Sequence, residues 1–198
     1  MPYPLYAYCG LVSWNFFASS LRFAVNSLTG NSNLVTKVYF PREIFPFSTV
    51  VVSLVDFAVA SVVLVLFMVY YGIGVTPAIA FLPVVLVVHV AFTAGVALLL
   101  AMANLYYRDV KYLFEVVLTL WMFATSVLYP VSKVGGRLAE VLQLNPMTPI
   151  IEAYRSVLLR GDLPAAGPFG LASVMAFTML AFAWVVFHRA EFEFAEYI

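Results

Sequence analysis

The chain has 198 residues, of which 64% are hydrophobic and only 10% are charged, and its formal net charge is +0. Soluble domains are usually about 25% charged, so this composition excludes a water-soluble globular protein, and the balanced charge predicts no nucleic-acid partner. No Asp, Glu, Lys or Arg occurs from Phe57 to Tyr107, where only a Gly- and Pro-containing stretch at 72–77 interrupts the apolar run. We therefore expect an integral membrane protein in contact with membrane lipids.

Five segments are predicted as membrane-spanning helices, because a span needs roughly 20 mostly apolar residues. They cover about 5–21, 46–71, 79–104, 113–130 and 169–187. The first is the weakest, because polar residues between Trp14 and Ser20 dilute it. The sequence thus predicts an all-α, polytopic membrane protein with a single transmembrane domain over 1–198.

Basic residues are unevenly distributed between the two sides of the predicted membrane domain. The segments after the first, third and fifth spans contain Arg22, Lys37, Arg42, Arg108, Lys111 and Arg189, whereas the opposite side has Lys133, Arg137, Arg155 and Arg160 in one long segment. Short connections rich in Lys and Arg stay in the cytoplasm. The first set, and with it the carboxyl terminus, is therefore predicted to be cytoplasmic.

The start of the chain conflicts with this topology. Five spans and a cytoplasmic carboxyl terminus would place Met1 on the outer face, yet the uncharged residues Pro2, Tyr3 and Pro4 lack the basic start of a signal peptide. We therefore expect that one upstream span is missing and that the domain is truncated at its amino terminus.

Small residues recur every four positions in the third predicted span. Ala91 and Gly95 form one stripe, and Thr93, Ala97 and Ala101 form another. Helices in lipid associate closely where small residues let their backbones approach. The pattern predicts tight packing of this helix, with simple enrichment of Ala as the alternative.

The cytoplasmic connection after the first span predicts a short amphipathic helix. Asn31, Ser32 and Asn33 are residue types that begin helices, Leu34 and the apolar residues after it give one apolar face, and Pro41 ends the helix. Such a helix would either lie among lipid headgroups or dock into a cytoplasmic partner.

The outer segment 131–168 is long enough for two short helices, the first near Gly136. In the second, Thr148 is predicted to cap the amino end, with Pro149 in the first turn, Glu152 near the positive end of the helix dipole, and Gly161 closing the helix. An apolar face then runs along this helix. We expect both helices to lie at, or dip into, the outer leaflet.

Few polar side chains fall inside the predicted spans. Asp56 is an acid well within the second span, where an unpaired carboxylate is costly, so it is predicted to have a polar partner, to line a conduit or to couple protons. His89 is predicted to be a polar packing residue. The two histidines and the single Cys9 are scattered, so no metal site and no catalytic residues are expected.

Several stretches resemble one family of membrane proteins. They are YPLYAYCGLVSWNFFASSL, NLVTKVYFPREIFP, NLYYRDVKYL and NPMTPIIEAYRSVLLRG, followed by a final span and a tail with FEFAE. In this order and spacing they resemble the membrane subunit of type 2 ABC exporters, in the branch that exports lipid-linked polysaccharides such as O-antigen, capsule and teichoic acid. Members of that branch usually have six spans, which also implies that one span is absent here.

The resemblance implies a permease that forms a homodimer in the bacterial inner membrane and binds two copies of a separate cytoplasmic ABC ATPase. The sequence agrees, because it has no GxxxxGK[ST] phosphate loop. We therefore expect a transporter subunit and not an enzyme, with no cofactor bound by this chain and with ATP and Mg used by the partner subunit.

The resemblance also suggests roles for particular residues. Contact with the ATPase is predicted for Lys37, Val38, Tyr39, Phe40, Pro41, Arg42 and Glu43, with a second contact or an ion pair at Arg108 and Asp109. The path of a lipid-linked glycan is predicted to include Trp14, Phe17, Asp56, Trp121 and Tyr129, since aromatic faces suit sliding sugar rings. The alternative for each aromatic residue is packing in the core or against lipid. Helices that gate the outer end are predicted to contain Asn145, Pro146, Pro149, Glu152, Tyr154 and Arg155.

The sequence leaves three other functions open. A type 2 ABC exporter for a drug or lipid would have the same architecture with a different cargo. An ion-coupled secondary carrier would use Asp56 and His89, and a membrane enzyme would need a cluster of acids and histidines that the sequence does not suggest.

Overall fold

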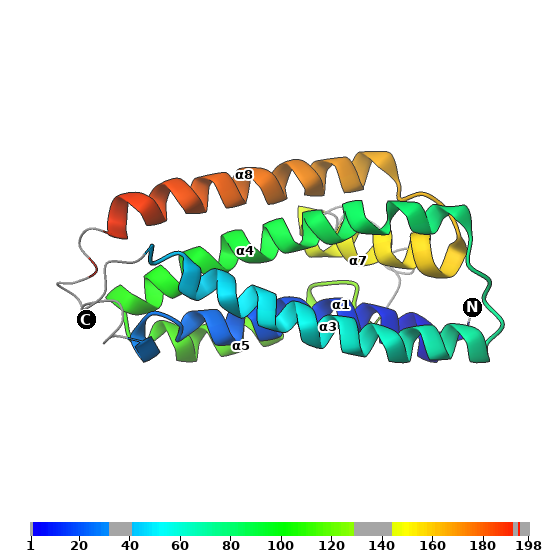
Figure 1. The fold of residues 1–198 in the computed structure, drawn as a ribbon, viewed down its shortest axis with the longest axis horizontal. Helices are drawn as coiled ribbons and strands as arrows, with labels where there is room; N and C mark the ends of the chain where they lie inside the picture. The colour runs from blue at the N-terminus through cyan, green and yellow to red at the C-terminus, as the bar shows by residue number, and fades with distance from the viewer. Residues whose placement is uncertain (1, 32–40, 129–143, 192–193, 195–198) are drawn as a thin grey trace.

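The computed structural model describes residues 2–31, 41–128, 144–191 and 194, and every regular element within these ranges is helical (Figure 1). The longer helices are α1 (Tyr3–Val25), α3 (Ile44–Tyr70), α4 (Leu82–Tyr106), α5 (Val110–Phe123) and α8 (Ala166–Ala190). The short α7 (Met147–Arg155) continues as the π-helical turn η4 (Ser156–Arg160), and two 3-10 turns are η1 (Thr29–Asn31) and η2 (Pro77–Phe81). The predicted all-α fold is confirmed for these residues.

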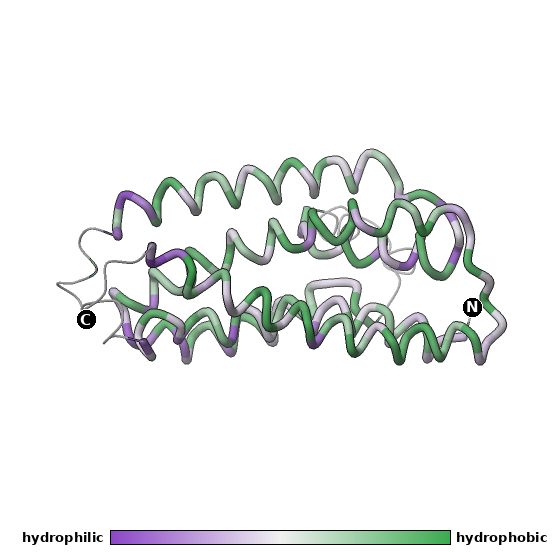
Figure 2. The backbone as a smooth tube through the Cα atoms, viewed as in Figure 1, coloured by the Kyte–Doolittle hydropathy of each residue, from purple (hydrophilic) through white to green (hydrophobic). Residues whose placement is uncertain are grey.

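Three helical segments are long and apolar enough to cross a membrane. They are α3, Pro77–Tyr106 (η2 with α4) and α8. These segments match the predicted spans 46–71, 79–104 and 169–187, and their apolar character is visible in Figure 2. The predicted total of five spans is not confirmed, because α1 and α5 are not among the three segments.

The predicted fourth span, 113–130, is wrong as a single helix. α5 ends at Phe123, and its 14 residues rise about 21 Å, less than the roughly 30 Å of a bilayer's hydrocarbon core. Residues 124–127 form turns, and the Thr125 hydroxyl donates a hydrogen bond back to the Trp121 carbonyl at 2.7 Å. α5 therefore stops part-way along the bundle (Figure 1).

The centre of the bundle is formed by α1 and α4. Phe17 and Leu21 of α1 and Ala97 of α4 are fully buried, and α1 packs most extensively on α3, as α4 does on α8. By contrast, α3 exposes an apolar face along most of its length. A large exposed apolar face is unfavourable in water but suits contact with lipid chains.

Most of the described basic side chains lie at one end of the bundle. At one end the carboxyl ends of α1, α4 and α8 meet the amino ends of α3 and α5 (Figure 1). This end, which we call the basic end, carries Arg22, Arg42, Arg108, Lys111 and Arg189. The predicted grouping of these side chains is confirmed, and its cytoplasmic location stays a prediction. Lys37 lies outside the described residues.

The segment between α1 and α3 was predicted to be an amphipathic helix. Asn31, predicted to begin it, instead ends η1, and its side-chain amide donates a hydrogen bond to the Ser27 carbonyl at 2.8 Å. Residues 32–40 lie outside the described part of the chain, so the helix itself stays a prediction.

Close packing between α4 and α8 depends on Gly95. A Cβ atom at this position would lie 2.9 Å from the backbone nitrogen of Leu180 and 3.0 Å from its Cα. Real Cβ atoms do not approach backbone so closely, so only Gly lets the two helices come together here. The predicted tight packing of this helix is confirmed.

We expect Gly95→Ala to lower the thermal unfolding midpoint of the detergent-solubilised protein, because the added methyl group must push α8 away from α4. Overpacking of this kind costs about 1–3 kcal/mol. Circular dichroism during heating measures the change.

The matched control is Gly170→Ala on α8, where an added Cβ has nothing within 4 Å and the midpoint should stay the same or rise slightly. Equal midpoints for the two variants would contradict the packing role of Gly95.

Candidate functional site

Arg155, on α7, is completely buried and donates hydrogen bonds to two other segments of the chain. Its Nε atom bonds the Tyr6 carbonyl at 3.3 Å, and its Nη1 atom bonds the Tyr6 hydroxyl at 2.8 Å. After α5, the Ser126 carbonyl accepts from Nη1 at 2.7 Å and the Val127 carbonyl from Nη2 at 2.6 Å. One guanidinium group thus joins α1, the end of α5 and α7.

The guanidinium reaches these acceptors through a gap in α1 at Gly10. A Cβ atom at Gly10 would lie 2.3 Å from Nη2 of Arg155 and 2.5 Å from the Val127 carbonyl oxygen. The charged plane also lies over the Tyr6 ring, 3.6 Å from its centroid. Gly10 leaves the space and Tyr6 covers the charge, which favours burial of an Arg at this position.

Glu152, one turn before Arg155, links a second cation to the same cluster. Its Oε1 atom accepts from Nη1 of Arg155 at 2.8 Å and from the Tyr6 hydroxyl at 3.0 Å, while Oε2 accepts from Nη2 of Arg160 at 2.7 Å. We call Tyr6, Glu152, Arg155 and Arg160 the α7 charge cluster. Two cations with one carboxylate give this cluster a surplus of positive charge.

Asn145 fastens the start of α7 to the end of α5. Its Oδ1 atom accepts from the Trp121 indole at 3.0 Å and from the Met147 amide at 3.2 Å. Its Nδ2 atom donates to the Thr125 hydroxyl at 2.8 Å. α7 therefore begins beside the end of α5 and continues along the bundle toward the end opposite the basic end (Figure 1).

The structure corrects one predicted cap and confirms one predicted terminus. The helix begins at Met147 after Pro146, and Thr148 does not cap it: its buried hydroxyl has no hydrogen-bond partner among the described residues. Pro149 is buried in the first turn, as predicted. Gly161 closes the segment with φ of +76°, a conformation that favours glycine.

The structure describes only one of the two predicted gate helices. The first, near Gly136, lies outside the described residues. The second is α7, in which every residue except Glu152 is buried, including Tyr154, whose hydroxyl lies 3.4 Å from Nδ1 of His89. α7 is thus packed inside the bundle and does not lie on its surface.

At the basic end, the residues just before α3 are tied to the end of α8. Arg42 donates a hydrogen bond to the Glu191 carbonyl and lies over the Phe194 ring, 5.9 Å from its centroid. Nδ1 of His188 is 3.4 Å from a carboxylate oxygen of Glu43 and 3.0 Å from one of Glu191. A force on the segment before α3 would therefore also act on α8.

The other residues predicted to contact an ATPase are only partly described. Lys37, Val38, Tyr39 and Phe40 lie outside the described residues, and Pro41 is exposed next to Arg42. Arg108 and Asp109 are exposed in the turn between α4 and α5, and within the described chain they form no ion pair with each other. Both side chains are thus accessible at the basic end.

The residues predicted to line a path do not lie on one surface. Trp14 and Phe17 are buried in the core, where Phe17 stacks on Phe92 and meets Trp121 edge-on. Asp56 is exposed on α3 and has no hydrogen bond or ion pair to another described residue, so its predicted polar partner is not found there. Tyr129 lies outside the described residues.

Sequence reasoning missed three contributors to these contacts. Tyr6 and Gly10 appeared only as parts of an apolar span, although a Tyr and a Gly four residues apart on one helix face could have suggested a site for a cation. Asn104 was also overlooked: it is buried near the basic end, donates to the Val25 carbonyl at 2.7 Å and accepts from the Lys111 amide at 3.3 Å.

We expect Arg155→Met to destabilise the protein by about 3 kcal/mol or more, because it removes the buried guanidinium that donates to the Tyr6, Ser126 and Val127 carbonyl groups. Thermal unfolding in detergent, followed by tryptophan fluorescence, measures the loss.

Arg160→Met is the matched control, since Arg160 bonds the same Glu152 carboxylate but is 42% exposed. Such pairs contribute about 0–1 kcal/mol. If both variants lost the same stability, Arg155 would not have the structural role described here.

Comparison with known proteins places this architecture in one family. Residues 3–159 match the model of the family described as ABC-2 type transporter. The chain is 31% identical to the O-antigen export system permease protein RfbA of Myxococcus xanthus, over 99% of this chain and 76% of that protein. It is 26% identical to a protein of the same name from Klebsiella pneumoniae, over 98% of this chain and 75% of that protein.

The family match includes α1, α3, α4, α5 and α7, and the alignment with the Myxococcus xanthus protein covers almost the whole chain. Both comparisons agree with the resemblance found in the sequence, and membership of this family excludes the ion-coupled secondary carrier. The two residues predicted for such a carrier differ in burial, since Asp56 is exposed and His89 is fully buried. The chain belongs to the ABC-2 type transporter family and is a multi-pass membrane permease.

Proposed function

We propose that this chain is the membrane subunit of an ABC exporter that moves O-antigen polysaccharide, carried on a lipid, across the bacterial inner membrane. The observation that carries the proposal is similarity over almost the whole chain to permeases named for O-antigen export. A capsule or teichoic acid precursor is the related class of cargo that the same architecture would serve.

The cargo path is proposed to run between two copies of the permease. Support comes from the packing of the single chain, in which Trp14 and Phe17 of α1 are buried against neighbouring helices. A polymer of sugar rings needs a wide route, and the core of one closely packed bundle leaves no such width. A homodimer would form the route from surfaces that a single copy exposes, and the face of α3 that carries Asp56 is one such surface.

The energy source is proposed to be a separate ABC ATPase that binds the basic end of the bundle and uses ATP and Mg. Arg42 and Glu43 would contact it together with Lys37, Val38, Tyr39, Phe40 and Pro41, and Arg108 with Asp109 would form a second contact. The basic end would then face the cytoplasm, with the carboxyl terminus on the same side.

The link from the basic end to α8 suggests how closure of the ATPase could reach the other side of the membrane. Arg42 and Glu43 contact the end of α8, and α8 runs back along the bundle to the turn that follows η4 (Figure 1). Movement of α8 would therefore act on α7 and its charge cluster. In this proposal α7 is the element that gates the outer end.

Complementation tests the function directly. The chain is expressed with its cognate ATPase in a strain that makes O-antigen but lacks its own export permease. Surface O-antigen, measured with antibodies on intact cells, should reappear, and should not reappear when the ATPase carries a substitution that abolishes ATP hydrolysis. Intracellular accumulation of the polymer despite normal levels of both proteins in the membrane would contradict the proposed cargo.

Charge reversal tests the ATPase contact. Arg108 forms no ion pair with another described residue. We expect Arg108→Glu to reduce co-purification of the ATPase and surface O-antigen severalfold, because a basic side chain at the contact with the partner would become acidic. Arg42→Glu should have at least as large an effect, since Arg42 also holds the end of α8.

Arg22→Glu is the control for charge reversal at the same end. Arg22 is half-exposed and pairs with Glu115 at 3.2 Å, a surface pair of little energetic value. It should keep ATPase binding near the wild-type level. Full ATPase recovery with Arg108→Glu and Arg42→Glu would rule out the proposed contact.

A further inference from the structure

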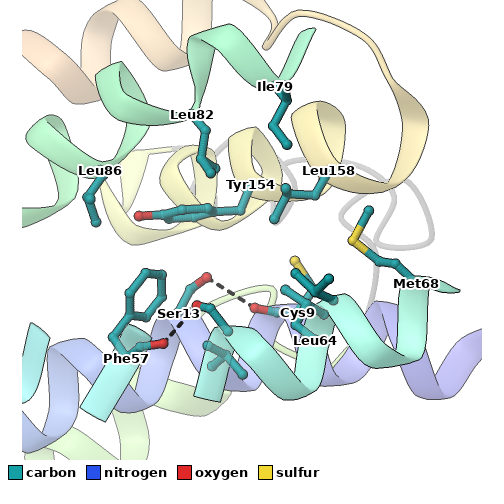
Figure 3. A pocket seen from close by; sticks show the side chains of 13 residues that line it. Cys9, Ser13, Phe57, Leu64, Met68, Ile79, Leu82, Leu86, Tyr154 and Leu158 are labelled. Carbon is teal, nitrogen blue, oxygen red and sulfur yellow. Dashed lines mark hydrogen bonds between the residues drawn. The ribbon is translucent and has the colours of Figure 1, made fainter. Parts of the chain in front are cut away.

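A cavity lies between α1, α3, α4 and α7, in the half of the bundle away from the basic end (Figure 3). It has a volume of about 140 Å³. Its walls include Cys9 of α1, Leu64 and Met68 of α3, Leu82 of α4, and Tyr154 of α7, with Leu158 from η4. Nothing in the export of a polysaccharide between two copies of the chain requires this space.

The cavity is lined to hold hydrocarbon and not water. Its two serine hydroxyls are already used within helices: Ser13 donates to the Cys9 carbonyl at 3.0 Å and Ser61 to the Phe57 carbonyl at 2.7 Å (Figure 3). An enclosed water needs two to four polar partners, and a similar apolar cavity of about 150 Å³ in another protein stays dry and binds benzene. An apolar group is therefore the matching ligand.

The mouth of the cavity opens onto the apolar surface of the candidate spans. Val65 of α3 and Ile79 of η2 belong to the lining, yet 55% and 38% of their respective surfaces are exposed. Both residues lie in segments that are long and apolar enough to cross a membrane. In a bilayer this surface contacts lipid chains, so the cavity is continuous with the hydrocarbon phase.

We propose that the cavity binds a segment of an acyl chain from a bilayer phospholipid, which enters between α3 and η2. The inserted chain contacts Tyr154 and Leu158 and therefore packs directly against α7 and η4. A phospholipid bound here packs against the apolar side of α7, the helix that carries Glu152 and Arg155 of the α7 charge cluster. The lipid is thus a structural ligand of the permease and distinct from the exported glycolipid.

Photo-crosslinking tests this site. The intact chain is placed in vesicles of phosphatidylethanolamine and phosphatidylglycerol that contain a phosphatidylcholine with a diazirine in its acyl chain. Mass spectrometry after illumination should find lipid adducts on inward-facing wall residues, including Cys9 and Leu64. A matching phospholipid with the diazirine in its headgroup should not label these residues, and labelling of only the exposed face of α3 by the acyl probe would overturn the proposal.

Ser61→Leu should abolish the adducts inside the cavity by filling it. Its matched control is Ser173→Leu on α8, because the Ser173 hydroxyl also donates to a carbonyl four residues earlier and lies outside the cavity. The control should keep wild-type labelling. Unchanged cavity labelling in Ser61→Leu would overturn the proposal, and if that variant does not fold, the comparison of acyl and headgroup probes in the wild-type chain decides.

A third probe separates a membrane phospholipid from the carrier of the cargo. Vesicles that contain a photoactivatable polyprenyl phosphate should give no more cavity adducts than the surface of α8 gives. If the polyprenyl probe alone labelled Cys9, the ligand would be the cargo's tail and the phospholipid proposal would be wrong. This outcome does not depend on whether O-antigen is the exported glycan.

Discussion

The buried guanidinium of Arg155 is the interaction on which the arrangement of α7 depends. A charge inside an apolar bundle is unfavourable unless its donors are satisfied, and Arg155 satisfies them with carbonyls from α1 and from the turns after α5 and with the Glu152 carboxylate. Those turns exist because α5 stops at Phe123. The early end of one helix thus supplies the acceptors that hold the next one inside the bundle.

The sequence predicted best what depends on long runs of apolar residues. α3, α4 and α8 lie where they were expected, because a run without charge has few alternatives in a membrane protein. α5 was predicted too long, since hydropathy counts Val127 and Leu128 as span residues but does not register that Thr125 and Asn145 stabilise a turn there. The end of α5 depends on local hydrogen bonds of polar side chains, and a hydropathy average over many residues does not detect them.

Fewer features of the candidate site could be predicted from the sequence. Arg155 was predicted to belong to the outer gate helices together with Asn145, Glu152 and Tyr154, and that gating role stays a prediction. Its complete burial could not be predicted, because the acceptors come from positions more than one hundred residues earlier and about thirty residues earlier in the chain. For Asp56 the prediction assumed too much burial. A buried charge is costly without a polar partner, so a partner was expected, but the Asp56 side chain is exposed on α3.

The contacts of Arg155 also have a consequence for biosynthesis. Within the described residues, every group that accepts a hydrogen bond from its guanidinium belongs to a residue that precedes it in the chain. These acceptors therefore leave the ribosome before Arg155 does, so this cation can enter the membrane at a position where its hydrogen-bond partners already lie. Among the described helices α8 is inserted after α7, and its close approach to Gly95 then adds α8 to a bundle in which α7 is already held.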